Sequence, residues 1–275
     1  MKILDLLTAG KKLLKEENID EREARLLLAF ALGIKSDDLG KYFEVDDSTG
    51  EKYNKIIIKR KNHVPYSYIT GNKEFMKLNF KVNENVLIPR ADTEILVEEA
   101  INICKEFGDR QISVLDMCTG SGCIAVSLAK YVENAKVIAS DVSEEALQVA
   151  RENAISNNVF VDFIKSNLFE NINDRFDVIV SNPPYIKKAV IDTLDKEVKD
   201  NEPMLALDGG EDGLRFYRAI SNEAKEYLYE NGYLIFEIGY DQAKEVEEIL
   251  NQVGYKNIRV IKDYSGNDRV VVANI

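Results

Sequence analysis

Histidine is almost absent from this chain, which has a single one, His63, among 275 residues. Enzymes of the Ser-His-Asp and Cys-His kinds need a histidine next to the nucleophile as its general base. His63 lies between Asn62 and Val64 after the basic run KRK, so we expect it at the surface. The scarcity of histidine therefore argues against most hydrolases that use a nucleophilic serine or cysteine.

Cysteine is sparse and odd in number, with Cys104, Cys118 and Cys123 only. An odd, scattered set is not a disulfide framework, which fits a protein of the cytosol. Zinc sites usually combine two closely spaced cysteine pairs, or one such pair with histidines. With one histidine available, the sequence predicts no metal site.

Long hydrophobic runs are missing, and no apolar stretch approaches the roughly 20 residues of a membrane-spanning helix. The first residues, MKILDLLTAGKKLLKEEN, lack the apolar core and small-residue cleavage site of a signal peptide. The sequence therefore predicts a cytoplasmic protein with no membrane partner.

Positive charge is also in deficit, because the net charge is −12 at pH 7. Phosphate backbones repel such a chain unless its basic residues form a patch. The one noticeable cluster comprises Lys55, Lys59, Arg60 and Lys61, which we expect to be a solvated helix face. The charge thus disfavours nucleic acid as the main partner.

The N-terminal part of the chain has a helical pattern. Apolar residues recur at helical spacing through residues 3–34, which predicts two helices, and a third helix is expected over about 50–63. Between residues 74 and 89 the apolar period changes to that of strands, with a turn expected at residues 83–85. We therefore predict a helical domain over 1–72, a β-hairpin connector over 73–89 and a larger domain over 90–275.

The larger domain alternates strands with helices, which predicts an α/β fold with a mostly parallel sheet covered on both faces. The last run, NIRVIKDYSGNDRVVVANI, has two strands joined by a short polar turn and predicts an antiparallel hairpin. The expected strands are 112–117, 135–140, 160–165, 176–181 and 232–238, and the expected helices are 92–106, 121–131, 143–156, 212–230 and 241–253.

A glycine-rich loop follows the first strand of this domain, at residues 116–122. Glycines between a strand and a helix allow a tight turn and let a ligand approach main-chain N–H groups. The second strand ends in Asp141, where an acid commonly binds ribose hydroxyls. Because Gly120 to Ala125 also satisfies the relaxed dinucleotide pattern G-x-G-x-x-A, these residues alone leave open a nicotinamide cofactor, or a turn with no ligand at all.

The fourth strand ends in SNPPYI, and its Asn182 is expected beside the glycine loop. The side-chain oxygen of Asn182 and the carbonyl oxygen of Pro183 are two acceptors that can take both hydrogens of a substrate NH₂ group. An amide or aromatic amine nitrogen is a poor nucleophile, so orienting it towards an activated methyl group supplies much of the rate. Tyr185 can pack on a flat substrate group or on a sulfonium cation. A proline-rich turn without function is the weaker alternative once the glycine loop and Asp141 are considered together.

Taken together, these motifs resemble the class I S-adenosylmethionine-dependent methyltransferases, and among them the release factor glutamine methyltransferases (the PrmC/HemK family). The resemblance covers nearly the whole chain. It is carried by PYSYITGNKEF (65–75), NVLIPRADTEILVE (85–98), VLDMCTGSGCIAVSLA (114–129), ASDVSEEAL (139–147), DVIVSNPPYI (177–186) and EPMLALDGGEDGLRFYR (202–218).

This resemblance implies a seven-stranded Rossmann-like methyltransferase sheet with a terminal hairpin, and a helical N-terminal domain that helps to bind a protein substrate. It implies S-adenosyl-L-methionine as cofactor and, as substrate, the glutamine of a Gly-Gly-Gln tripeptide in class I peptide chain release factors. The implied cofactor contacts are Cys118, Thr119, Gly120, Ser121, Gly122, Asp141, Leu168 and Asn182. The implied substrate contacts are Asn182, Pro183, Pro184 and Tyr185, with Asn182, Pro183 and Tyr185 as the catalytic group.

The sequence departs from the family pattern at three places. Cys118 stands where glycine is usual, Asn167 replaces an acid, and Ala91 replaces a frequent proline. Two other functions compete: an amino methyltransferase acting on adenine or guanine in nucleic acid, and a binder without catalysis. Acidity and the lack of an evident base-flipping insert count against the first, and the intact NPPY motif against the second. We expect a monomer.

Overall fold

The computed structural model describes all 275 residues, which form two units. The N-terminal unit comprises Met1–Gly71 together with Asp195–Asn201, and the sheet unit comprises Asn72–Leu194 with Glu202–Ile275. The domain limits expected from the sequence remain predictions. None of the helices has the combination of length and apolarity needed to span a membrane.

The N-terminal unit is helical, as its apolar spacing predicts. Ile3, Leu6 and Leu14 of the first helix are buried in its core, and the Asp46 carboxylate caps the third helix by accepting a hydrogen bond from the Thr49 amide at 2.8 Å. Its elements are α1 (Ile3–Glu16), α2 (Glu23–Leu32), the 3₁₀ helix η1 (Ser36–Lys41), α3 (Asp47–Lys61), α4 (Tyr66–Thr70) and α9 (Lys196–Lys199).

The basic cluster on α3 differs from the expected solvated face at one position. Lys55 and Lys59 are exposed, but Arg60 is only 4 % exposed. Its guanidinium is paired with the carboxylates of Glu23 and Glu197. The expectation was wrong for Arg60 because these two acids compensate its charge inside the unit.

A β-hairpin opens the sheet unit, but its turn lies earlier than the sequence suggests. Strands β1 (Asn72–Phe75) and β2 (Leu78–Lys81) pair antiparallel, and the turn falls at Met76-Lys77, both with positive φ. A two-residue turn of this kind usually contains Asn-Gly or Asp-Gly, so Met-Lys gives no sequence signal. The expected turn at 83–85 does bend the chain, but residues 86–88 form no strand.

The main sheet has seven strands in the order β5-β4-β3-β6-β7-β9-β8. All neighbours are parallel except for the pairs that include β9, which confirms the predicted α/β fold with an antiparallel C-terminal hairpin. The strands are β3 (Ile112–Met117), β4 (Ala135–Asp141), β5 (Asp162–Lys165), β6 (Phe176–Ser181), β7 (Leu228–Glu237), β8 (Lys256–Lys262) and β9 (Asp268–Asn274).

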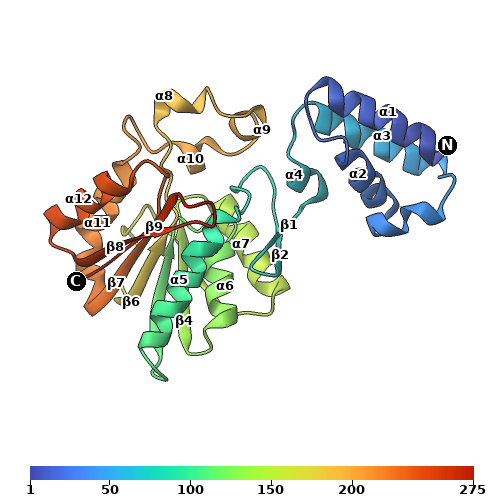
Figure 1. Cartoon of the computed structure of the whole chain (residues 1–275). Coiled ribbons are helices and arrows are strands. Elements are labelled where there is room, and N and C mark those ends of the chain that lie inside the picture. The colour runs from blue at the N-terminus through green and yellow to red at the C-terminus, as the bar shows by residue number, and fades with distance from the viewer. The chain divides into compact units, whose positions relative to one another are not determined.

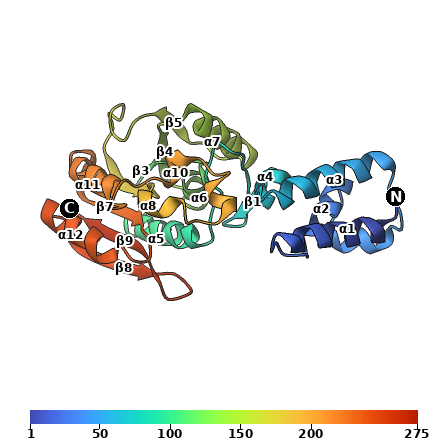
Figure 2. The ribbon, with the colours of Figure 1, turned by 90° about the horizontal axis from the view of Figure 1, so that it is seen from above.

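Helices cover both faces of this sheet (Figure 1), and the two layers are also seen from above (Figure 2). Helices α5, α6 and α7 contribute to one apolar layer, and α11 and α12 to the other. Two short helices, α8 and α10, lie in the loop after β6. The bounds are α5 (Asp92–Glu106), α6 (Cys123–Tyr131), α7 (Glu144–Ser156), α8 (Lys188–Ile191), α10 (Met204–Leu207), α11 (Arg215–Tyr227) and α12 (Ala243–Val253).

Strands β3 and β6 are direct neighbours, with Met117 paired to Ser181 at their carboxyl ends. The Ser181 hydroxyl donates a hydrogen bond to the Met117 carbonyl at 2.7 Å. The glycine-rich loop after β3 and the NPPY loop after β6 therefore begin side by side, as ligand-binding loops do in open α/β sheets.

Candidate active site

The glycine-rich loop after β3 turns through three left-handed residues, Cys118 (φ 62°), Gly120 (φ 54°) and Gly122 (φ 79°). The two glycines are needed for different reasons. A Cβ on Gly122 would lie 2.9 Å from Cβ of Ala150, so this glycine lets α6 and α7 pack closely. A Cβ on Gly120 would meet nothing within 4 Å, so its backbone faces open space.

Asp141, at the end of β4, holds this loop in place. One carboxylate oxygen accepts the Gly120 amide at 2.8 Å, and the other accepts the Ser143 amide at 2.9 Å. Each oxygen keeps a lone pair for a further donor. Burial raises the pKa of this carboxyl, and the two amides partly offset that rise.

A second acid, Asp116, lies deeper under the loop and is fully buried. One of its oxygens accepts the Thr119 hydroxyl at 2.5 Å and the Ala125 amide at 3.1 Å, and the other oxygen has no partner. Burial raises the pKa of Asp116 to about 7. Asp116 thus ties the loop to the start of α6.

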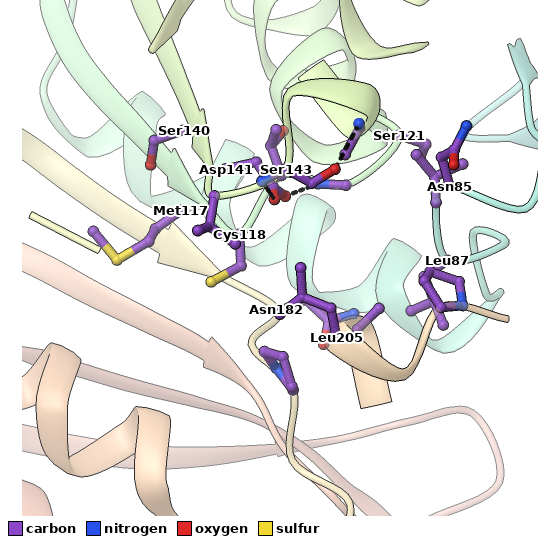
Figure 3. A pocket seen from close by; sticks show the side chains of 18 of the residues that line it. Asn85, Leu87, Met117, Cys118, Ser121, Ser140, Asp141, Ser143, Asn182 and Leu205 are labelled. Atoms are coloured by element: carbon purple, nitrogen blue, oxygen red, sulfur yellow. Dashed lines mark hydrogen bonds between the residues drawn. The ribbon is translucent and has the colours of Figure 1, made fainter. Parts of the chain in front are cut away.

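A cavity opens above these residues (Figure 3). It is lined by residues 84–87, 89–90, 117–121, 123–124, 140–143, 145–146, 166–168, 203 and 205–206, with Thr93, Asn182, Pro184 and Phe216. In Figure 3, Asp141 and Ser143 lie on one side of the cavity, and Asn182 lies near Leu205 on another. The lining combines oxygen acceptors with apolar groups, as sites for small organic ligands commonly do.

The wall formed by residues 84–90 is fixed at both ends. The Asn153 amide group on α7 accepts the Lys81 N–H and donates to the carbonyls of Lys81 and Ser121. At the other end, Arg90 forms an ion pair with the buried carboxylate of Glu202, just before α10. These contacts join two walls of the cavity that are distant in sequence.

Asn182 extends towards the cavity from the end of β6. Its side-chain nitrogen donates to the hydroxyl of Thr93 at 3.4 Å, and Thr93 is only 2 % exposed. Because the nitrogen is turned towards Thr93, the side-chain oxygen of Asn182 is the atom free to accept from a ligand.

Tyr185 does not line the cavity. Its hydroxyl donates to the carboxylate of Glu237 at 3.3 Å, and its carbonyl accepts from the side-chain amide of Gln242 at 3.0 Å. Two glycines touch its backbone: a Cβ on Gly209 would lie 2.7 Å from Cα of Tyr185, and a Cβ on Gly213 would lie 2.5 Å from its carbonyl oxygen. The glycines of the LDGGEDGL segment thus serve close packing against the NPPY loop.

Most of the residues that the sequence singled out meet at this cavity. Those that line it are Cys118, Thr119, Gly120, Ser121, Asp141, Leu168, Asn182 and Pro184, whereas Gly122, Pro183 and Tyr185 are next to lining residues in the sequence but do not line it themselves. Sequence reasoning missed Thr93, Glu237 and Gln242. Glu237 carried a usable signal, because it is an acid at the end of the apolar run YLIFE, and such a charge is seldom buried without a reason.

Cys118 takes the left-handed backbone conformation, which favours glycine. A non-glycine residue there stores some backbone strain. Burial raises the pKa of its thiol far above the ordinary value. The side chain is therefore a neutral part of the cavity wall at physiological pH.

Two known family descriptions match this chain. The methyltransferase small domain matches residues 92–211, and the PrmC N-terminal domain matches residues 5–71. The release factor glutamine methyltransferase of Clostridium botulinum is 41 % identical over 99 % of both chains. That of Fusobacterium nucleatum is 40 % identical over 99 % of this chain and 83 % of its own.

Among solved structures, a methyltransferase from Pyrococcus furiosus has a similar fold. It superposes with a TM-score of 0.54 at 24 % identity, covering 74 % of this chain and 91 % of its own. With the cavity, its acid and its NPPY loop in place, the near-complete match to the sequence relatives settles the family. This chain belongs to the release factor glutamine methyltransferases.

Proposed function

We propose that this protein transfers a methyl group from S-adenosyl-L-methionine to the side-chain amide nitrogen of the glutamine in the Gly-Gly-Gln motif of class I peptide chain release factors. The observation that carries the proposal is that one cavity joins Asp141 and the glycine-rich loop to Asn182 of the NPPY motif. Full-length similarity to release factor glutamine methyltransferases supports the substrate.

The residues around Asp141 fit the cofactor. Asp141 presents two oxygens that can accept ribose hydroxyls, and the open space at Gly120 lets a ligand approach the backbone. The apolar side chains of Val142 and Leu168 suit a flat base. We assign the cofactor contacts to Cys118, Thr119, Gly120, Ser121, Gly122, Asp141, Leu168 and Asn182. When bound, the cofactor supplies an electrophilic methyl group on a sulfonium.

The amide is oriented by two acceptors of the chain. The side-chain oxygen of Asn182 and the carbonyl oxygen of Pro183 take the two amide hydrogens, while Thr93 keeps the nitrogen of Asn182 turned away. Pro184 and Tyr185 complete the substrate-binding motif. Holding both hydrogens directs the nitrogen lone pair and lowers the barrier by positioning. The methylated nitrogen is strongly acidic and loses one of its two protons to water, so no histidine base is needed.

We further propose that the protein acts as a monomer in the cytoplasm, where translation supplies its substrate. The helical N-terminal unit contributes to binding the release factor. Nucleic acid is not the methyl acceptor, because the chain is strongly acidic and Arg60, in its one basic cluster, is buried in ion pairs.

The test combines the purified protein, radiolabelled S-adenosylmethionine and unmodified release factor, with a Gly-Gly-Gln to Gly-Gly-Ala factor as control. We expect label on the parent factor alone, with the mass of one methyl group gained. Label on the control factor would place the chemistry on another residue. Label on RNA or DNA but not on the factor would replace this function by that of a nucleic-acid amino methyltransferase.

A further inference from the structure

Glu237 is a buried acid that the proposed reaction leaves without a task. It ends β7, beside the strand that leads into NPPY, and is 2 % exposed. One of its carboxylate oxygens accepts the Tyr185 hydroxyl, and the other is buried with no hydrogen-bond partner. Burying a carboxyl in this way costs stability. The nearby charge of Arg269 offsets part of this cost, but well-packed apolar residues are often no less stable than a buried ion pair, so stability alone gives no reason for a glutamate here.

Gln242 binds the backbone carbonyl of the same tyrosine. It lies just before α12 and is 4 % exposed. Its nitrogen donates to the carbonyls of Tyr185 and Gly213, at 3.0 and 3.3 Å. Its oxygen accepts the Gly239 amide at 2.9 Å and the Tyr217 hydroxyl at 3.3 Å. Gln242 is therefore itself held, and it transmits the position of the β7 end to the NPPY loop.

The two contacts leave the loop little freedom. Tyr185 is held at its hydroxyl and at its carbonyl, and Gly209 and Gly213 fill the space against its backbone. The two prolines before Tyr185 have fixed φ angles. A fixed Tyr185 therefore dictates where the carbonyl of Pro183 and the side chain of Asn182 point.

We infer that Glu237 and Gln242 are positioning residues, which set the direction of the amide-accepting atoms by holding Tyr185. Neither residue lines the cavity, and each contacts Tyr185 directly. The expected effect on kcat rests on the proposed function. The energetic coupling between Tyr185 and Glu237 does not, because it can be measured on the folded protein alone.

The kinetic test measures kcat, KM for the release factor and Kd for S-adenosylmethionine in Glu237→Leu and Glu237→Gln. A misplacement of the order of 1 Å lowers a rate by about 100-fold, so we expect kcat of Glu237→Leu to fall by about 10- to 100-fold. Kd for the cofactor should stay within about threefold. Glu237→Gln keeps an acceptor for Tyr185 and should recover most of the rate. Gln242→Glu, which loses the donor to the Tyr185 carbonyl, should also lower kcat.

A matched control exists on the same strand. Tyr233 of β7 donates to Glu106 of α5 at 3.0 Å, in an exposed tyrosine–glutamate pair away from the cavity. Glu106→Leu should leave kcat unchanged. An equal loss in Glu106→Leu and Glu237→Leu would overturn the inference, as would a Glu237→Leu protein with the parent kcat, or one in which cofactor affinity falls as much as kcat.

The energetic coupling between Tyr185 and Glu237 can be measured without an activity assay. The measurement compares the denaturant midpoints of the parent, Tyr185→Phe, Glu237→Leu and the double variant. If Glu237 acts through Tyr185, the double variant unfolds at the midpoint of Glu237→Leu. Fully additive shifts would overturn the inference even if methylation is found. Absence of methylation by the parent protein, with the coupling present, would instead refute the proposed function and leave the physical link standing. Should Glu237→Leu fail to fold, Glu237→Gln and Gln242→Glu supply the same comparison.

Discussion

The two loops that meet at the cavity are held in opposite ways. In the glycine-rich loop, the acids Asp116 and Asp141 bind groups 3 to 21 residues away. In the NPPY loop, the partners of Asn182 and Tyr185 lie 52 to 89 residues away, on α5, β7 and the start of α12. A cofactor loop can therefore be recognised from one short stretch, whereas the substrate loop depends on the folding of the whole sheet unit.

The largest expected effect falls on the substrate side. Asn182→Ala removes an acceptor for the amide hydrogens, so kcat should fall by about 100- to 1000-fold, as when one polar group is removed from a preorganised site. Calorimetry should find S-adenosylmethionine binding within a few-fold of the parent. Asn173→Ala, at an exposed residue, serves as the control. Unchanged turnover in Asn182→Ala would remove this residue from the mechanism.

The complementary change is Asp141→Asn on the cofactor side. Asparagine has a single acceptor, so its NH₂ group would face one of the backbone amides that Asp141 now accepts. Losing a charged hydrogen bond costs about 1.5–3 kcal/mol, so Kd for the cofactor should rise by about 10- to 100-fold. At saturating cofactor, kcat should recover. Asp174→Asn, at an exposed acid, should bind as the parent does.

Glycines offer a sharper comparison. Gly209→Ala places a methyl group against the backbone of Tyr185 and should lower the free energy of unfolding by about 1–3 kcal/mol, together with kcat. Gly120→Ala points into open space, so it should weaken cofactor binding and leave kcat at saturating cofactor unchanged. Because φ of Gly120 is 54°, this variant should also lose about 1–2 kcal/mol of unfolding free energy. Gly40, which has neither a close neighbour nor a positive φ, is the control, and Gly40→Ala should change neither property. If Gly209→Ala weakened cofactor binding, or if Gly120→Ala lowered kcat at saturating cofactor, the division between the two loops would fail.

The smallest effect concerns pH. The pKa of Asp116 is about 7 in the folded protein against 3.8 for the free side chain. Between these values the folded state holds a proton that the unfolded state has lost, so stability falls as pH rises. Relative to Asp116→Asn, the parent should lose at most about 1.4 kcal/mol of unfolding free energy per pH unit from pH 5 to 7. The negative charge of Asp141 adds to the rise in the pKa of Asp116. The parent and Asp116→Asn both contain Glu237, so its own titration cancels in the difference between them. A constant difference in denaturant melts would show that Asp116 is ionised throughout.

The contrast between the loops also explains what the sequence could predict. Alternating strands and helices indicated the sheet and its terminal hairpin, and the ends of β3, β4 and β6 indicated the cavity with Asp141 and Asn182. The supports of NPPY were missed, because Glu237 and Gln242 form no motif with it and meet it only through strand order, although the acid at the end of the apolar run YLIFE was a signal. The turn at Met76-Lys77 was missed for a different reason, since its residues are not turn formers; the hairpin that it closes brings Phe75 and Phe80 into edge-to-face contact.

The N-terminal unit is built from two separate segments of the chain. Because Asp195–Asn201 belongs to this unit, the backbone passes between the two units three times. Glu197, which follows β6 in the sequence, therefore pairs with Arg60 of α3. After a single protease cut behind Gly71, the two pieces would still be held together by the noncovalent contacts of residues 1–71 with Asp195–Asn201, the Arg60–Glu197 ion pair among them. A fragment beginning at residue 72 would retain Glu197 while losing the arginine that neutralises it, so residues 1–71 alone are not the whole of the helical unit.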